Sequence, residues 1–291
     1  MIGTALSRLL ESQGHELIKL SLHKKDGNSL YWNPYESIMP IDDFLEIDVV
    51  IHLAAESITQ LWTKKAKERI YESRVTGTKF LAEAIFNAKN RPKLFISASG
   101  ASIYESSENK AIAADEQSTL SEGGGFLSQV AKAWEQSTKI IEETETRLIL
   151  LRTGIVLSKE GGALASMLPI FRAGLGGPQG SGKQLVSWID IADLVNAIYF
   201  CIFNQGLKGP VNMVAPEVVT NAEFSQTIAN TLHRPCWFRV PGFLLKLVLG
   251  ELAEETILQS TNIYPKKLID SGFKFKYETL EKSLRHLLKG D

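Results

Sequence analysis

Hydroxyl-bearing side chains gather directly after one predicted strand of this 291-residue chain. Residues 93–97 form an apolar, β-leaning run, and Ser99, Ser102 and Tyr104 follow it. Core packing accounts poorly for such a cluster, whereas hydroxyl groups at the end of a strand can polarise a carbonyl group or donate a proton. The segment therefore predicts a catalytic crevice, although packing of Tyr104 on its loop is an equally good interpretation of that residue.

A second candidate segment lies at the end of the strand predicted for residues 15–22. In a dinucleotide-binding fold this position reads the adenosine ribose, where an acidic residue favours NAD and basic residues accommodate the 2′-phosphate of NADP. No acidic residue stands between the strand and Asp26, while Ser21, His23, Lys24 and Lys25 can all bind phosphate. NADP is therefore favoured over NAD, although the two lysines also suit a solvated turn.

Strands and helices alternate along the first two thirds of the chain. We predict strands at 15–22, 47–55, 93–97, 147–152 and 211–214, and helices at 1–14, 63–89, 127–143 and 191–204. This alternation is typical of βαβ units and predicts an α/β fold with a doubly wound, Rossmann-type parallel sheet. Helical segments dominate after Thr220 and predict a smaller, mostly helical C-terminal lobe. We expect a dinucleotide-binding domain at 1–160, to which 184–215 returns, and a substrate-side lobe at 161–291.

The sequence begins in a predicted amphipathic helix, with Gly3 near its start. A dinucleotide site needs a strand, a glycine-rich turn and a helix whose N-terminal N–H groups face the pyrophosphate. Of these parts only the helix is recognisable, and Gly3 takes the place of the last glycine of the turn. We therefore expect a Rossmann domain without its first strand and glycine-rich loop, and weak cofactor binding if the protein starts at Met1.

Composition narrows the class of function. Thirty-two basic and 33 acidic residues give a net charge of −1, which predicts no nucleic-acid or membrane partner and favours a small-molecule substrate. The sequence has neither a run of about 18 apolar residues nor a signal-peptide pattern, so we expect a cytoplasmic protein. Cys201 and Cys236 lie far apart and the five histidines are scattered, so no metal site is expected.

Two further segments have more than one interpretation. Seven glycines lie between Gly161 and Gly182, and they indicate either a mobile loop over the substrate or a close approach of the backbone to another part of the chain. Asp190 and Asp193 resemble an acid/base pair, but their position at a predicted helix start is better explained by helix capping.

Six ordered passages carry a resemblance to a known family. They are LAAESI at 53–58, ESR at 72–74, LRTGIVL at 151–157, GLGGPQGSG at 174–182, WIDIADL at 188–194 and NMVAP at 212–216. Together they resemble the extended short-chain dehydrogenases/reductases of the NAD-dependent epimerase/dehydratase family. The resemblance is closest to an atypical group of nucleoside-diphosphate-sugar epimerases that ends in a helical region of unassigned function.

The resemblance implies a set of cofactor-binding residues beyond Gly3. It places Ser21 beside the adenosine ribose, although the arginine often found next in the family is Leu22 here. It lays Leu53 and Ala54 along the nucleotide, brings Arg74 within reach of the cofactor and sets Val156 near the nicotinamide. An ion pair on the helix surface is the competing interpretation of Arg74.

The catalytic positions depart from the wider superfamily. Its chemistry uses a Ser or Thr, a Tyr as acid/base and a Lys four residues after the Tyr. Ser99 matches the first and Lys132 the last, but Ser128 stands where the Tyr belongs, and a serine hydroxyl has too high a pKa to replace a phenol. Tyr104 is the nearest substitute, so Ser99, Tyr104 and Lys132 are the candidate catalytic residues.

Two functions are consistent with this sequence. The resemblance implies an NAD(P)-dependent oxidoreductase or nucleotide-sugar epimerase of unknown substrate, with a homodimer as a family expectation. The alternative is a non-catalytic NADP-binding sensor or interaction protein that keeps the fold but lacks the catalytic Tyr.

Overall fold

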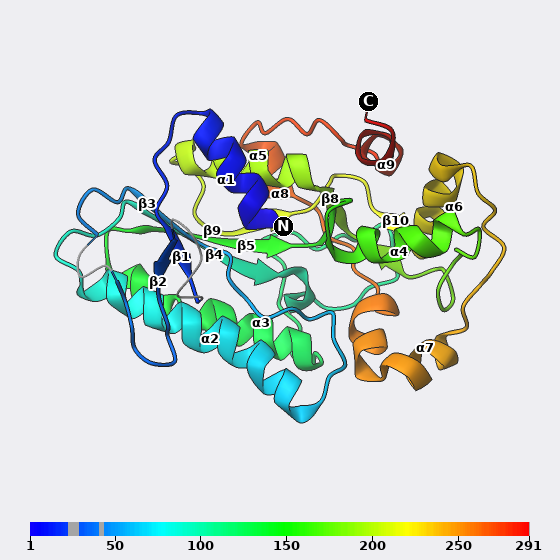
Figure 1. Cartoon of the computed structure of the whole chain (residues 1–291), viewed down its shortest axis with the longest axis horizontal. Helices are drawn as coiled ribbons and strands as arrows, with labels where there is room; N and C mark the ends of the chain where they lie inside the picture. Colours follow the sequence, from blue (N-terminus) through cyan, green and yellow to red (C-terminus); the bar gives the residue numbers. More distant parts are fainter. Residues whose placement is uncertain (23–28, 41–43, 291) are drawn as a thin grey trace.

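The computed structural model describes residues 1–22, 29–40 and 44–290. At its centre lies a parallel sheet with the strand order β3-β4-β5-β9 (Figure 1). These strands are Val49–His52, Leu94–Gly100, Arg147–Thr153 and Gly209–Met213. Ile96 pairs with Ile51 on one side and Ile149 on the other. The apolar runs in the sequence predicted these strands because a parallel sheet covered on both faces buries successive side chains.

Two further strands lie beyond β3. β1 (Lys19–Ser21) pairs in parallel with β2 (Ser29–Tyr31), but this pair is a separate sheet from β3-β4-β5-β9. In the described ranges no strand bridges the two sheets. Val49, Val50 and Ile51 of β3 are only half-buried, whereas β4 is buried along most of its length. The expectation that the domain lacks its first strand stays a prediction.

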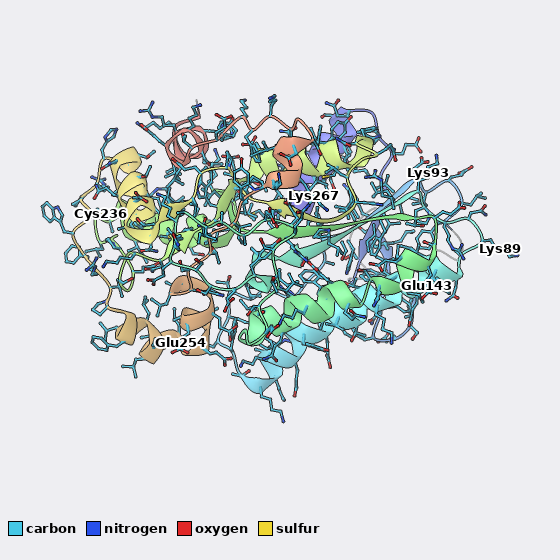
Figure 2. The ribbon with its side chains drawn as sticks, turned by 180° about the vertical axis from the view of Figure 1, so that it is seen from behind. Lys89, Lys93, Glu143, Cys236, Glu254 and Lys267 are labelled. Atoms are coloured by element: carbon cyan, nitrogen blue, oxygen red, sulfur yellow. The ribbon has the colours of Figure 1, made fainter. Side chains whose placement is uncertain are left out.

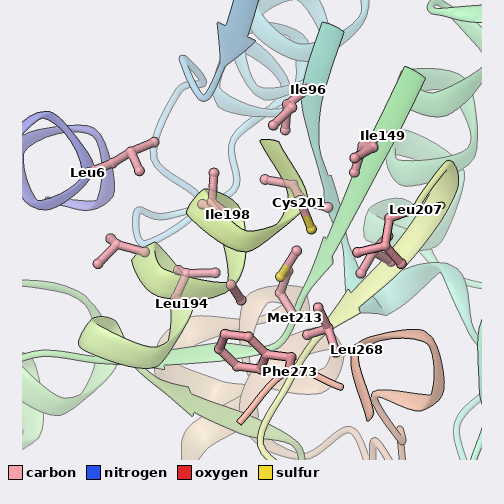
Figure 3. Close-up of a cluster of buried hydrophobic side chains, with 14 of the residues drawn as sticks. Leu6, Ile96, Ile149, Leu194, Ile198, Cys201, Leu207, Met213, Leu268 and Phe273 are labelled. Atoms are coloured by element: carbon pink, nitrogen blue, oxygen red, sulfur yellow. The ribbon is translucent and has the colours of Figure 1, made fainter. Parts of the chain in front are cut away.

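Helices cover both faces of the central sheet. They are α1 (Ile2–Ser12), α2 (Lys64–Asn87), α3 (Phe126–Gln136), α4 (Gly162–Arg172), α5 (Ile191–Phe203), α6 (Asn221–Leu232), α7 (Gly242–Leu249), α8 (Lys266–Asp270) and α9 (Leu280–Lys289). On one face α1 and α5 place Leu6 and Ile198 against sheet residues such as Ile96 (Figure 3). On the other, α2 packs Ile85 against Phe95. The predicted α/β Rossmann-type fold is confirmed.

The helix predicted for 127–143 is divided in the structure. α3 ends at Gln136, and a 3₁₀ turn, η2 (Lys139–Glu143), follows. The hydroxyls of Ser137 and Thr138 donate to the carbonyl oxygens of Trp134 at 2.6 Å and Glu135 at 2.7 Å. Such local hydrogen bonds compete with the helical pattern and explain the break.

A second core lies at the other end of the sheet. Two short strand pairs contribute to this end: β6 (Ile155–Leu157) with β8 (Trp188–Asp190), and β7 (Leu185–Val186) with β10 (Val219–Thr220). Trp188 is fully buried there against apolar residues of α4, α6 and α9. A capping box fixes the start of α6, in which Thr220 and Glu223 bond each other's backbone N–H. The helical C-terminal region is thus present as predicted.

Two buried carboxylates attach the C-terminal segment to α5. Asp190 caps α5 by accepting from the Ala192 N–H at 2.8 Å, and it also accepts from the Ser283 hydroxyl at 2.6 Å. Asp193 accepts from the backbone N–H groups of Lys276 and Tyr277. Burial raises the pKa of both carboxyls. The expected capping role of Asp190 is confirmed. The structure also shows hydrogen bonds from Asp190 and Asp193 to the C-terminal segment, which the sequence did not predict.

The glycine-rich segment packs closely against the C-terminal region. A methyl group on Gly177 would overlap the carbonyl oxygen of Phe238. Backbone hydrogen bonds join Gly180 N–H to the Val240 carbonyl at 2.9 Å and Val240 N–H to the Pro178 carbonyl at 3.0 Å. Of the two interpretations offered by the sequence, these contacts favour the close approach, because the glycines admit a neighbouring backbone.

Within the described ranges, no helix combines the length and the apolar character that a membrane span requires. Within the same ranges, no group of three or more His, Cys, Asp or Glu side chains is placed to hold a metal ion.

Candidate active site

The register of the central sheet brings the hydroxyl-rich segment beside β5. Ser99 and Gly100 end β4, and they pair with Arg152 and Thr153 at the end of β5. Ser99 is 6% exposed and Tyr104, one residue beyond the short turn η1 (Ala101–Ile103), is 3% exposed. The predicted catalytic hydroxyls therefore lie at the carboxyl edge of the sheet, but both are buried.

A hydrogen-bonded network joins Ser99 to Tyr104. The Ser99 hydroxyl donates to Glu135 Oε1 at 2.7 Å. Arg152 donates two hydrogen bonds to the same carboxylate, from Nε and Nη2, at 2.8 Å each. Arg152 Nη1 also donates to the Tyr104 hydroxyl at 2.9 Å. Tyr104 in turn donates to Asn212 Oδ1 at 2.8 Å. Bidentate, charge-assisted contacts of this kind fix side chains strongly.

The electrostatics of this network keep the Tyr104 phenol protonated and the Arg152 guanidinium charged. Burial raises the pKa of Tyr104 even though Arg152 opposes the shift, so the phenol keeps its proton at neutral pH. Burial disfavours the charged form of Arg152, but Glu135 more than offsets this effect and raises its pKa. The Tyr104 hydroxyl both accepts a hydrogen bond from Arg152 and donates one to Asn212, whereas the Ser99 hydroxyl makes a single hydrogen bond, to Glu135.

Sequence reasoning missed Glu135 and Arg152. Arg152 is the penultimate residue of the apolar strand β5, where a buried guanidinium requires a carboxylate partner. The side chain of Arg152 is only 5% exposed and that of Glu135 only 12%. An arginine at the end of an apolar run is therefore a signal of a buried ion pair, but the sequence does not say which acidic residue completes it.

Lys132 lies on α3, outside the Ser99–Tyr104 network. Its ammonium group donates to the Ser121 carbonyl oxygen. One turn earlier, the buried Ser128 hydroxyl has no hydrogen-bond partner among the described residues. The structure thus brings Ser99 and Tyr104 together through Arg152 and Glu135, and it gives Lys132 a different partner.

The C-terminal region reaches the start of α3, close to Ser128. Glu255, in a short π-helical turn η3 (Ala253–Ile257), accepts from the Phe126 and Leu127 N–H groups at 2.7 Å each. Glu251 forms an ion pair with Lys67 of α2. Both contacts join residues far apart in the sequence, and no local pattern indicated them.

The start of α1 is a suitable place for a phosphate group. No side chain caps this helix, so its first N–H groups can meet an anion. A methyl group on Gly3 would meet nothing within 4 Å. The side chain of Met1 lies against Gly161 and Gly162, beyond the end of β6, which carries the half-buried Val156. Gly3 and Val156 therefore belong to neighbouring segments, as a shared cofactor site requires.

Arg74 supports the segment that follows β3. Its Nη1 donates to the Glu56 carbonyl at 2.9 Å, and its guanidinium lies 5.1 Å from the Trp134 ring centroid. Burial lowers its pKa to about 10, so it stays charged at neutral pH. Leu53 and Ala54 lie three and two residues before Glu56, and Ala54 is exposed. Arg74 therefore fixes the backbone beside the residues that the resemblance assigns to the nucleotide.

The ribose end of the site is only partly described. Ser21 is the last residue of β1, but His23, Lys24 and Lys25, on which the preference for NADP rests, lie outside the described residues. A groove of about 880 Å³ lies elsewhere, between α6 and α9, and contains none of the predicted site residues. The predicted site residues that the structure describes therefore lie mainly at the carboxyl edge of the sheet and at the start of α1.

Two family models match most of this chain. The NAD dependent epimerase/dehydratase family matches residues 1–214, and a domain of unknown function, DUF1731, matches residues 240–287. The epimerase family protein YfhF of Bacillus subtilis is 36% identical over 99% of this chain and 94% of its own. The epimerase family protein ML0860 of Mycobacterium leprae is 34% identical over 98% of this chain and 92% of its own.

Solved structures extend the comparison to three dimensions. The human epimerase family protein SDR39U1, crystallised with NADPH, superposes with a TM-score of 0.91 at 30% identity, over 100% of this chain and 97% of that one. A nucleoside-diphosphate sugar epimerase from Corynebacterium glutamicum superposes with a TM-score of 0.80 at 31% identity, over 100% of this chain and 56% of that one. The chain belongs to the NAD dependent epimerase/dehydratase family, as an SDR39U1-type epimerase family protein with a C-terminal DUF1731 region.

Proposed function

We propose that this protein binds NADPH and catalyses hydride transfer to or from a small carbonyl or nucleotide-sugar substrate. The observation that carries the proposal is the full-length similarity to human SDR39U1, whose crystal structure contains NADPH. The residues of this chain fit such a cofactor: the uncapped start of α1 suits the pyrophosphate, and the exposed Ala54 leaves room for a nucleotide. A bound NADPH supplies a hydride from C4 of its nicotinamide.

We assign Ser99 to the substrate oxygen. Its hydroxyl has one hydrogen-bond partner, Glu135, so it can turn toward a carbonyl group without disturbing the Glu135–Arg152 pair. Tyr104 is a less suitable proton donor because Arg152 and Asn212 already occupy its hydroxyl. In this assignment Tyr104 positions Arg152 and Arg152 positions Glu135, in each case through hydrogen bonds. Glu135 in turn orients the Ser99 hydroxyl. Lys132, with a different partner, lies on the side of α3 that carries Ser128.

Cofactor binding is tested by titrating the protein with NADPH and NADH and following nicotinamide fluorescence. The variant Gly3→Glu places a carboxylate where the pyrophosphate is expected and should weaken NADPH binding at least about tenfold through charge repulsion. Its folding should be unchanged, because nothing lies within 4 Å of that position. Gln13→Glu adds the same charge beyond the other end of α1 and is the matched control. No NADPH binding by the unmodified protein would refute the proposal.

A cofactor-sensing protein without catalysis is the second candidate. The observation that favours it is the combination of Ser128 in the place of a phenol with a Tyr104 hydroxyl already bonded on both sides. NADPH oxidation in the presence of carbonyl compounds and nucleotide sugars separates the two functions. Turnover that is lost in Ser99→Ala supports the enzyme. NADPH binding without turnover of any substrate supports the sensor.

A further inference from the structure

Glu255 of the C-terminal region is bound to the first turn of α3. Its Oε1 accepts from the Phe126 N–H and its Oε2 from the Leu127 N–H, both at 2.7 Å. The N-cap residue of α3 is Gly125, which has no side chain to cap the helix. A methyl group on Gly125 would overlap the Glu255 carboxylate, so this glycine leaves the room that the carboxylate fills. The start of α3 is therefore already occupied by an anion of the chain itself.

This contact lies beside the candidate active site. The Leu127 carbonyl accepts from the Ser102 hydroxyl at 3.3 Å, and Ser102 belongs to the hydroxyl-rich segment that follows β4. Further along the same helix, Glu135 accepts from the Ser99 hydroxyl. At about 1.5 Å per residue, the part of α3 from its start to Glu135 is about 13 Å long. The Glu255 carboxylate therefore stands about one small-molecule length from the level of Ser99 along this helix.

A buried hydroxyl without a partner lies in the same turn of α3. Ser128 is 4% exposed, and its Oγ has no hydrogen-bond partner among the described residues. A methyl group on Gly124 would overlap the Ser128 side chain, so this side chain lies against the backbone that leads to Gly125 and the Glu255 carboxylate. Buried polar groups are usually satisfied, so an unpaired hydroxyl is a place where a ligand atom or a water molecule is expected.

The other charges near η3 are engaged as well. Glu251 forms an ion pair with Lys67, and Glu254, labelled in Figure 2, pairs with Lys246 at 2.8 Å. Lys132, further along α3, keeps its positive charge but donates to a backbone carbonyl oxygen. A phosphate group binds best to free N–H groups at a helix start or to unpaired cations. The donors that a phosphate group would use at this turn are therefore already taken by partners within the chain.

We propose that Glu255 is a specificity-determining residue, which excludes phosphorylated substrates and restricts the site to small neutral carbonyl compounds. This inference rests on the proposed function, in which the substrate oxygen meets Ser99 and the rest of the substrate extends along α3. A nucleotide sugar carries its diphosphate a few bonds from the sugar carbons, so the diphosphate would approach the Glu255 carboxylate and be repelled. A neutral carbonyl compound meets no such repulsion, and the unpaired Ser128 hydroxyl can bond to its distal end.

Calorimetric titration of the full chain with UDP-glucose tests this role without requiring turnover. Saturating NADPH is present, so that the start of α1 is filled. Glu255→Ala frees the two N–H groups of α3 and should bind UDP-glucose at least about tenfold more tightly than the unmodified protein. Glu255→Gln keeps an acceptor for these groups, and with it the fold, and should gain about threefold from the lost charge. The matched control is Glu254→Gln, which removes the neighbouring carboxylate, pairs with Lys246 instead of α3, and should leave the affinity unchanged.

The outcomes separate this inference from the proposed function. Glu255 variants that bind UDP-glucose no more tightly than the unmodified protein overturn the inference, and so does turnover of a nucleotide sugar by the unmodified protein. An equal gain in Glu254→Gln also overturns it, because the effect is then one of overall charge. A protein that binds no NADPH refutes the proposed function. The same titrations in a Gly3→Glu background, which keeps anions from the start of α1, then still decide whether Glu255 excludes the diphosphate.

Discussion

Burial of His52 should make the stability of this protein depend on pH between about 4 and 6.5. The residue ends β3, is 4% exposed, and packs against the edge of Trp32 with ring centroids 5.8 Å apart. Its Nε2 atom is buried and has no hydrogen-bond partner among the described residues. Burial therefore disfavours the imidazolium and lowers the pKa of His52 from 6.5 to about 4.

The sign of the effect follows from proton binding by the two states. Between pH 6.5 and about 4 the unfolded chain binds a proton at His52 and the folded chain does not. Stability is therefore complete above pH 6.5 and falls as the pH is lowered toward 4. Each tenfold difference in proton affinity is worth about 1.4 kcal/mol, so this histidine should cost about 2 kcal/mol at pH 5 and about 3 kcal/mol near pH 4.

Urea unfolding at several pH values measures this cost. The variant His52→Phe keeps an aromatic ring beside Trp32 but cannot bind a proton, so its stability should fall less than that of the unmodified protein on acidification. Taking the difference between the two proteins removes the contribution of the carboxyl groups, which titrate in both. The exposed His233, where a positive φ of 53° suits asparagine, provides the control variant His233→Asn. An equal loss of stability in His52→Phe and the unmodified protein would refute the argument.

Two substitutions test the packing of the candidate site and its surroundings. Glu135→Gln leaves the buried Arg152 without its charged partner and should lower the free energy of unfolding by about 3 kcal/mol in urea titrations; a change below about 1 kcal/mol would contradict a buried pair. Gly177→Ala should destabilise the protein by more than about 2 kcal/mol, because the added methyl group overlaps the Phe238 carbonyl oxygen. Gly123→Ala, with nothing within 4 Å, should be neutral or slightly stabilising, and equal melting temperatures for the two alanine variants would show that the glycine-rich segment is not packed as described.

The order of strands and helices followed directly from local patterns. The apolar runs that became β4 and β5 and the amphipathic residues of α1 predicted elements close to those observed, because periodicity records which faces must be buried. The break after Gln136 was missed, because the hydroxyls of Ser137 and Thr138 bond backward in a way that the apolar pattern does not reveal. Candidate site residues at strand ends were likewise predictable, since strand ends in an α/β sheet gather at one edge.

The sequence by itself determined the α/β class and the helical C-terminal region, and it predicted the segments of the candidate site, because each depends on local composition and period. Only the tertiary structure decided what the side chains of those segments contact. Ser99 meets Glu135 from 36 residues away, and Tyr104 meets Asn212 from 108 residues away. The same holds for the glycine-rich segment, whose contact with Val240 gives its glycines a packing role. The physical reason is that a buried polar group must find a partner wherever the chain brings one, and no local pattern in the sequence records that distance.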